Sequence, residues 1–130
     1  MHDVVAAELL KLNQRLLDSI AGADWPTYQS LCDATLTCFE PEALGQLVEG
    51  MEFHRFYFQL PAAATPCTTT MASPHVRVMG DVAVLSYVRL NQRVLGDGSP
   101  VTRAVEETRV WQKRNGVWKH VHFHRSVPAE

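Results

Sequence analysis

Apolar residues recur at steps of three and four along the first part of the chain. Residues 4–24 read VVAAELLKLNQRLLDSIAGAD and contain one such stripe, formed by Val5, Leu9, Leu12, Leu16 and Ile20. This period predicts an amphipathic helix, and Gly22 is suited to its C-cap. Asp24 is then the expected N-cap of a second short helix, whose inward side chains are Tyr28 and Leu31.

The pattern becomes less regular in the next part of the chain. Residues 34–39, ATLTCF, alternate and predict a short strand. Two short helices should follow, the first starting at Pro41 and the second near Met51, with a corner at Gly50. Their expected inward residues are Leu44, Leu47 and Val48 in the first, and Phe53, Phe56, Tyr57 and Leu60 in the second. Residues 61–66, PAAATP, read as a loop.

From residue 67 onward the periodicity is that of strands. The predicted strand segments are residues 67–73, 74–81, 81–95, 101–113 and 117–127. The step Asn115-Gly116, between the last two segments, is a strong hairpin signal. Helices followed by a long antiparallel meander predict one α+β domain over residues 1–130, with the helices packed on one face of the sheet.

Residue parity assigns the faces of these strands, because successive side chains point to opposite sides. Three strands each place an arginine with large apolar residues, in the sets Leu85, Tyr87 and Arg89, then Glu107, Arg109 and Trp111, then Val121, Phe123 and Arg125. If the helices cover this face, each guanidinium must meet an acid or hold an anionic ligand. The spacing alone favours the simpler alternative, in which Glu106, Glu107 and surface water satisfy the arginines one by one.

The composition narrows the class of protein. The 130 residues carry a net charge of −2, and no basic run exceeds two residues. A nucleic-acid or anionic-membrane surface is therefore not indicated, and the sequence shows neither a membrane span nor a signal peptide. Cys32, Cys38 and Cys67 have no paired spacing, which is typical of a reducing compartment, so we expect a cytoplasmic protein with buried thiols.

Signals for catalysis or metal binding are weak. By simple alternation, HVHFH places His120, His122 and His124 on one strand face, where two neighbours could reach one metal ion, but no acid completes a set. We therefore expect half-buried or interface histidines, no metal and no cofactor. Asp33 or Asp81 could serve as a general base, but nothing in the sequence singles out either one. No phosphate-binding loop or nucleophile motif occurs.

Five blocks of sequence carry a resemblance to a known family. They are FEPEALGQLVEGMEFHRFYF, PHVRVMGD, YVRL, EETRVW and GVWKHVHFHRS, in this order. From about residue 8 to residue 127, the chain resembles the association, or hub, domain of calcium/calmodulin-dependent protein kinase II. The resemblance implies a cone-shaped α+β fold of the cystatin-like, or nuclear-transport-factor-two-like, type. In that fold a long N-terminal helix lies in the concavity of a strongly curved antiparallel sheet.

The resemblance also implies a role in assembly. Hub domains of this family pack into two stacked rings that concentrate the attached kinase domains, so we expect a closed double-ring homo-oligomer of about a dozen or more subunits. Neither enzymatic activity nor direct calmodulin binding is implied, because the sequence contains no kinase domain and no calmodulin-binding helix. The candidate assembly residues are Phe39, Glu40, Leu44, Leu47, Phe53, Phe56 and Tyr57.

A polar pocket lined by three arginines is a further feature of the family. By the resemblance these arginines correspond to Arg89, Arg109 and Arg125, and Tyr28 and His54 match further lining residues. Such a site would accept small carboxylates or kinase regulatory segments.

Three questions stay open at this point. Residues 59–67, QLPAAATPC, are shorter than the usual loop of the family and lack its tryptophan, so the role of this loop is open. The same fold also hosts isomerases, dehydratases and cyclases. An enzyme of this kind would here use Asp33 or Asp81 as base and Tyr28 as proton donor. Against this alternative, the three arginines would keep a nearby carboxylate ionised and therefore weakly basic. An adaptor that mixes into other hubs is a third alternative, and the chain could be a fragment of a kinase or a freestanding hub.

Overall fold

The computed structural model describes residues 2–61 and 67–127. Its helices are α1 (His2–Ala21), α2 (Trp25–Leu31) and α3 (Glu52–Phe58), with one 3-10 turn, η1 (Pro41–Ala43). Its strands are β1 (Cys32–Phe39), β2 (Val48–Glu49), β3 (Cys67–Met79), β4 (Val82–Val94), β5 (Pro100–Arg114) and β6 (Val117–Ser126). The predicted α+β class is confirmed.

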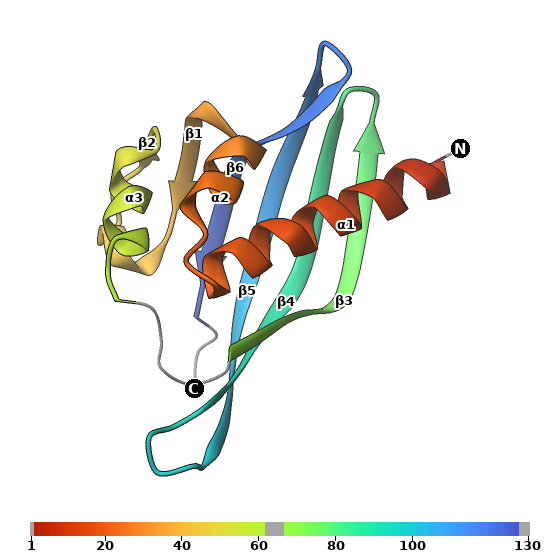
Figure 1. The fold of residues 1–130 in the computed structure, drawn as a ribbon. Coiled ribbons are helices and arrows are strands. Elements are labelled where there is room, and N and C mark those ends of the chain that lie inside the picture. The colour runs from red at the N-terminus through yellow and green to blue at the C-terminus, as the bar shows by residue number, and fades with distance from the viewer. Residues whose placement is uncertain (1, 62–66, 128–130) are drawn as a thin grey trace.

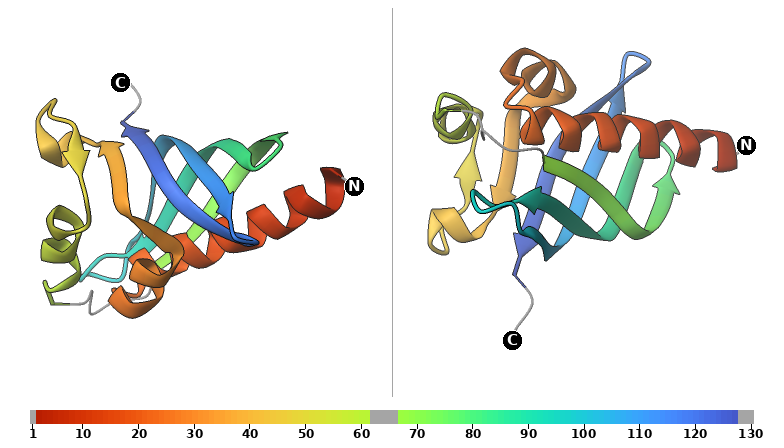
Figure 2. Two further views of the ribbon diagram at one scale, coloured as in Figure 1. Left: turned by 90° about the horizontal axis from the view of Figure 1, so that it is seen from above. Right: turned by 60° about the horizontal axis from the view of Figure 1, so that its bottom comes forward.

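The strands form one curved sheet in the order β2-β1-β6-β5-β4-β3. Strands β3 to β6 are an antiparallel meander, whereas β1 runs parallel to β6 and pairs with the short β2 at the edge. Figure 1 shows α1 crossing one face of the sheet, with α2 beside it and α3 near β1 and β2. The views in Figure 2 show the sheet curling around these helices. The helices thus cover the concave face, as predicted.

The apolar stripe of α1 forms much of the core, as its periodicity predicts. Leu9, Leu16 and Leu17 are fully buried, and Val5, Leu12 and Ile20 pack against the same core. Each fully buried leucine stabilises the fold by about 1.5–3 kcal/mol. Asn13 lies on this face too: its Nδ2 donates to the Tyr87 hydroxyl at 2.9 Å, and its Oδ1 accepts from Trp111 Nε1 at 3.0 Å. Polar contacts therefore fix the position of α1 on β4 and β5.

Helix α2 begins and packs as its sequence predicts. The Asp24 side chain accepts a hydrogen bond from the backbone N–H of Thr27, which satisfies one free donor of the first turn. Pro26 occupies that turn without loss of a hydrogen bond, and Tyr28 and Leu31 are buried. This short helix therefore delivers Tyr28 to the interior.

The segment between β1 and α3 differs from its prediction. The helix expected from Pro41 to Val48 is only the single turn η1, because Leu44 and Gly45 both adopt positive φ, 55° and 88°, which no helix continues. Val48 instead pairs with Cys38 as part of β2. Leu44 and Leu47 are consequently exposed and not inward.

Helix α3 forms at its predicted place but buries a different face. His54 is its buried side chain, and Phe53 packs against the core, while Phe56, Tyr57 and Leu60 are exposed. The prediction for the last three residues was wrong because α3 turns His54, not its widest apolar stripe, toward the sheet. A row of aromatic side chains is thereby left on the outer surface.

Two bulges change the predicted strand pattern. The register of β3 shifts between Ala72 and His75, so segments predicted as two strands form one bent strand. In β6 the register shifts at Val121, which puts His120 opposite Trp111 and on the buried face with Phe123. The prediction that the three histidines share one face was therefore wrong for His120, as was the inward position of Val121.

One predicted segment lies mostly outside the described part of the chain. The loop predicted at residues 61–66 falls largely on residues 62–66, which are not among the described residues. Of the helices that the structure describes, none is long and apolar enough to cross a membrane.

Candidate functional site

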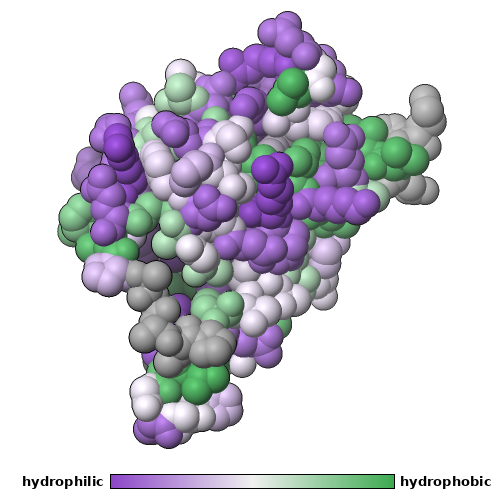
Figure 3. All heavy atoms as spheres, viewed as in Figure 1, coloured by the Kyte–Doolittle hydropathy of each residue, from purple (hydrophilic) through white to green (hydrophobic). Residues whose placement is uncertain are grey.

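One cavity of about 430 Å³ brings together the five residues predicted to line a pocket. Arg89, Arg109 and Arg125 reach it from β4, β5 and β6, Tyr28 from α2 and His54 from α3. The cavity is bounded by the C-terminal end of α1, and Figure 3 shows the hollow on this face of the molecule. Five residues that are distant in sequence therefore line one concave site.

Arg89 and Arg109 line the bottom of this cavity, and Glu107 pairs with both of them beneath its surface; we define these three residues as the floor. Arg89 Nη1 and Arg109 Nη2 donate to Glu107 Oε2 at 3.2 and 2.9 Å, and Arg109 Nε donates to Oε1 at 3.2 Å. All three residues are buried. The register between β4 and β5 is continuous, so alternate residues stay on the inner face, and Glu106 lies exposed on the other. Among the described residues, Glu107 is therefore the buried acid that pairs with both floor arginines.

The charges of the floor are fixed by this pairing. Burial raises the pKa of Glu107, but the guanidinium groups of Arg109 and Arg89 outweigh it and hold the pKa at about 2. Burial likewise lowers the pKa of Arg109, and Glu107 outweighs it, so this pKa is raised above its usual range. The floor thus carries two positive charges and one negative charge. A bound anion would balance this net positive charge.

A buried polar network holds the floor from behind. The Tyr87 hydroxyl donates to Glu107 Oε1 at 2.6 Å, and Arg109 Nη1 lies 3.4 Å from His120 Nε2. Because arginine only donates, His120 Nε2 accepts, and its Nδ1–H then donates to Cys32 Sγ at 3.4 Å. Burial lowers the pKa of His120 well below its usual value, which is consistent with this neutral tautomer. The floor arginines are therefore held in position without a ligand.

The rim of the cavity has the opposite charge arrangement, and we define it as Arg125, Glu40, Glu42 and His54. Arg125 Nη2 donates to Glu40 Oε2 at 3.2 Å and also to Glu42 Oε2. Burial raises the pKa of Glu40, although Arg125 opposes this. Burial and the charges of Arg109 and Arg125 lower the pKa of His54 to about 4, so its imidazole is neutral near pH 7. One cation is thus shared by two acids.

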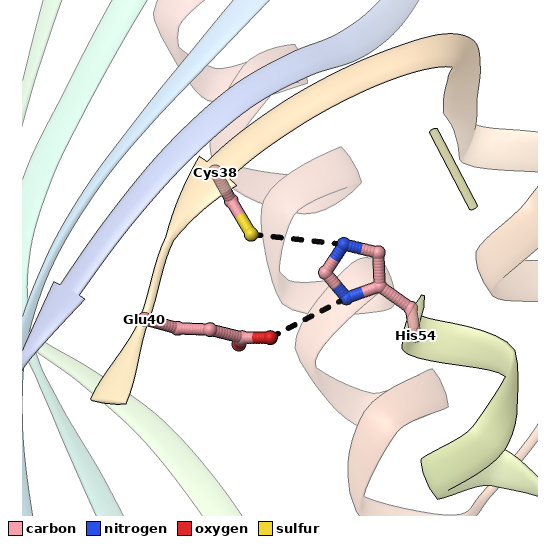
Figure 4. Close-up of side chains that lie close together, drawn as sticks. All are labelled: Cys38, Glu40 and His54. Atoms are coloured by element: carbon pink, nitrogen blue, oxygen red, sulfur yellow. Dashed lines mark hydrogen bonds and ion pairs between the residues drawn. The ribbon is translucent and has the colours of Figure 1, made fainter. Parts of the chain in front are cut away.

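His54 lies between a thiol and a carboxylate, as Figure 4 shows. Its Nε2 is 3.7 Å from Cys38 Sγ, and its Nδ1 is 3.7 Å from Glu40 Oε1. Burial, together with the nearby charge of Glu40, raises the pKa of the Cys38 thiol to about 12. These donor atoms lie close enough together to hold a metal ion. The two-residue spacing of Cys38 and Glu40 could have indicated their common face, but no local signal predicted His54 beside them.

Tyr28, the proposed proton donor of the enzyme alternative, is surrounded by aromatic rings. Its ring centroid lies 4.8 Å from that of Phe58, and burial raises its pKa well above the usual value. Of the two guessed bases, Asp33 binds Arg114 at 2.7 Å and Thr35, and neither Asp33 nor Asp81 is among the described residues that line the cavity. The acid–base pairing of that alternative is therefore not assembled here.

The candidate assembly residues fall into two groups. Phe39, Leu44, Leu47, Phe56 and Tyr57 are exposed, on β1, the segment after it and α3. Glu40 points into the rim with a side chain only 7% exposed, and Phe53 packs partly against the core. We call the five exposed residues the apolar wall. Of these five residues, Tyr57 also lines the cavity, whereas the other four are not among its described lining residues.

The sequence matches the family described as calcium/calmodulin dependent protein kinase II association domain over residues 5–129. The type II subunit delta of calcium/calmodulin-dependent protein kinase from Oryctolagus cuniculus is 49% identical over 122 residues. This match covers 92% of the chain but 23% of that relative, so the chain spans about a quarter of its length.

Solved structures agree with this match. The hub homology domain of Chlamydamonas reinhardtii is 52% identical with a TM-score of 0.90, covering 96% of this chain and 99% of that one. The association domain from C. elegans is 45% identical with a TM-score of 0.91, covering 96% and 97%. An NTF2-like protein of Cytophaga hutchinsonii (18%, TM-score 0.78, covering 95% and 98%) and a cystatin-like protein of Caulobacter vibrioides (14%, TM-score 0.70, covering 93% and 87%) share the fold alone. Both fold names predicted from the sequence are confirmed.

Proposed function

Because the chain belongs to the calcium/calmodulin-dependent protein kinase II association-domain family, we propose that its 130 residues assemble into a closed double ring of identical subunits. An association domain is the part of these kinases that oligomerises, and residues 5–129, which match it, contain no kinase domain. From the family resemblance, the proposed ring has about a dozen or more subunits. Its closure requires a surface on each copy that meets a different surface on the next copy.

The apolar wall is the observation that carries this proposal. Leu44 is 87% exposed and Phe56 is 59% exposed, and both lie within a stretch of 19 positions, from Phe39 to Tyr57, that also contains the other three wall residues. Several large apolar side chains exposed on neighbouring segments are typical of a contact between proteins, because their exposure to water is unfavourable. Aromatic side chains in particular are enriched in such contacts. A neighbouring subunit is the partner that fits an association domain.

Native mass, measured by light scattering on a sizing column, tests the assembly. We expect one discrete species of about a dozen or more subunits. Phe56→Glu places a charge in the apolar wall and should shift the mass to smaller species, because a buried unpaired charge opposes association. Val4→Glu is a matched control, since Val4 is also an exposed apolar residue on a helix. A monomer or simple dimer for the wild type would overturn the proposal.

We also propose that the cavity binds carboxylates, either small molecules or acidic side chains of a kinase regulatory segment. The positive excess of the floor supports this, and a guanidinium group offers paired donors to a carboxylate. Titration calorimetry with a panel of small carboxylates measures it directly, and absence of heat across the panel would remove this part of the proposal.

Within a longer protein, the same assembly would place several kinase domains at high local concentration. One subunit could then act on its neighbour without a diffusional encounter. A cytoplasmic setting fits this role, and the three free cysteines, two of them buried, support it.

A further inference from the structure

Three metal-binding side chains converge at the junction of β1 and α3. Cys38 lies on the inner face of β1, Glu40 follows the end of that strand, and His54 is the inward residue of α3. One donor atom from each lies within 4.8 Å of the other two (Figure 4). Cys38 and His54 are buried, and the Glu40 side chain is only 7% exposed. The three donors are therefore held together by the fold and are not a chance surface cluster.

The donor types favour one class of ion. A thiolate, an imidazole and a carboxylate are the ligands of zinc sites, whereas calcium and magnesium take oxygen ligands. Tetrahedral zinc, with bonds of about 2.3 Å to sulfur and about 2.0–2.1 Å to nitrogen, separates those two atoms by roughly 3.6 Å. The observed distance from Cys38 Sγ to His54 Nε2 is 3.7 Å. This pair is thus already spaced for zinc.

We propose that Cys38, Glu40 and His54 bind one Zn²⁺ ion per subunit through the thiolate, a carboxylate oxygen and Nε2, with the fourth position open to the cavity. Glu40 Oε1 now faces Nδ1 of the ring at 3.7 Å, so its carboxylate must move toward Nε2 to share the ion, which rotation of its flexible side chain allows. The imidazole keeps its proton on Nδ1, and the Cys38 thiol releases one proton to solvent.

The surroundings suit an ion that enters from the cavity. Glu40 and His54 line the cavity, while Cys38 is fully buried behind them, so the ion would meet two ligands before the third. The thiolate and the carboxylate together balance the two charges of zinc. Of the nearby cations, Arg109 stays paired with Glu107 and Arg125 with Glu42, which limits repulsion.

Zinc binding would also change the rim. An oxygen of Glu40 that ligates zinc gives up part of its charge to the ion, so Arg125 becomes more available to an anion in the cavity. The open fourth position faces the same space. This consequence rests on the proposed carboxylate function, but the zinc site itself does not.

Metal titrations of the purified full chain test the site, in whatever assembly state it adopts. After chelator treatment, calorimetry with Zn²⁺ alone should give one ion and about one released proton per subunit. Co²⁺ in place of zinc should give the near-ultraviolet charge-transfer band of a cobalt–thiolate bond. Cys38→Ser should abolish this band and weaken zinc binding at least tenfold, because it replaces one of only three protein ligands by a poor one. Cys67→Ser is the matched control, since Cys67 also lines the cavity but lies outside the cluster.

Three results would contradict the zinc site. Zinc binding that Cys38→Ser leaves unchanged, a missing cobalt–thiolate band, or no zinc binding by the wild type would each overturn the proposal. His54→Gln, checked for folding by circular dichroism, should weaken zinc binding as Cys38→Ser does. Zinc calorimetry and the cobalt–thiolate band depend neither on native mass nor on carboxylate binding. The zinc site can therefore be disproved while the proposed function stands, and the proposed function can be disproved while the zinc site stands.

Discussion

The floor and the rim of the cavity both contain arginine, but the ratio of arginines to carboxylates is reversed between them. At the floor, Arg89 and Arg109 share the single carboxylate of Glu107, all deeply buried. At the rim, Arg125 is shared by two carboxylates, Glu40 and Glu42, and remains partly exposed. Positive charge is therefore in excess at one end of the cavity and negative charge at the other.

The origin of each region explains this difference. The floor stands on adjacent strands in continuous register, and Tyr87 fixes its acid from behind. The rim is built from the end of β1, the single turn η1, the short helix α3 and the end of β6. A floor of this kind is preorganised for ligand binding. The rim side chains, in contrast, can exchange ion-pair partners with a small change in free energy. Binding strength is thus expected from the floor and selectivity from the rim.

Removing the floor acid should have the largest effect. Glu107→Gln leaves two buried guanidinium groups without a counter-charge, and we expect a loss of about 3–5 kcal/mol in the free energy of unfolding. Chemical denaturation monitored by circular dichroism measures it. Glu106→Gln is the control, because this neighbour is exposed on the other face, and its effect should stay within about 0.5 kcal/mol. Equal losses for both variants would contradict the pairing described for the floor.

Acidification should weaken the rim in a separate pH window. The pKa of His54 is about 4 in the fold against about 6.5 in an unfolded chain, so its neutral form stabilises the fold fully above pH 6.5. That stability is lost as the pH falls from 6.5 toward 4, by no more than about 3 kcal/mol, because the unfolded chain binds the proton first. His54→Gln should flatten this part of the stability–pH curve, measured by urea unfolding at several pH values.

The exposed His75 provides the control for that experiment, since His75→Gln should leave the curve as in the wild type. Some slope should persist in His54→Gln, because burial also lowers the pKa of His120. A curve for His54→Gln with the full wild-type slope would show that the rim histidine does not contribute.

Rim substitutions should change carboxylate binding in opposite directions, with the smallest free-energy effects. Arg125→Gln removes a charged donor and should weaken binding about tenfold or more. Glu42→Gln removes an internal competitor for Arg125 and should strengthen binding roughly two- to fivefold, since partly exposed ion pairs are worth less than about 1 kcal/mol. Calorimetry measures both, with Arg114→Gln, which pairs with Asp33 outside the cavity, as control. Weaker binding after Glu42→Gln would contradict the competition.

Sequence reasoning reached the floor more fully than the rim. Parity placed Arg89, Arg109 and Glu107 on one face because no bulge interrupts β4 or β5 where they pair. The same rule failed in β6, where a bulge at Val121 turns His120 inward. A bulge depends on how two strands pair, and the residue pattern of a single strand does not reveal that pairing.

The rim could not be predicted in the same way. Its helix before Gly50 is replaced by the single turn η1, because Leu44 accepts a left-handed conformation that its side chain disfavours. The approach of His54 to Cys38 and Glu40 is a tertiary contact, without a local signal. Parity placed Arg125 on the face of Phe123, and the family resemblance assigned it to a pocket, but its pairing with Glu40 and Glu42 had no local signal.

The hydrogen bonds of Asn13 to Tyr87 and Trp111 give α1 a mechanical link to the sheet. Tyr87 in turn donates to the carboxylate that both floor arginines share. A displacement of α1 along its axis would therefore strain the hydrogen bonds that position Glu107 beneath the cavity.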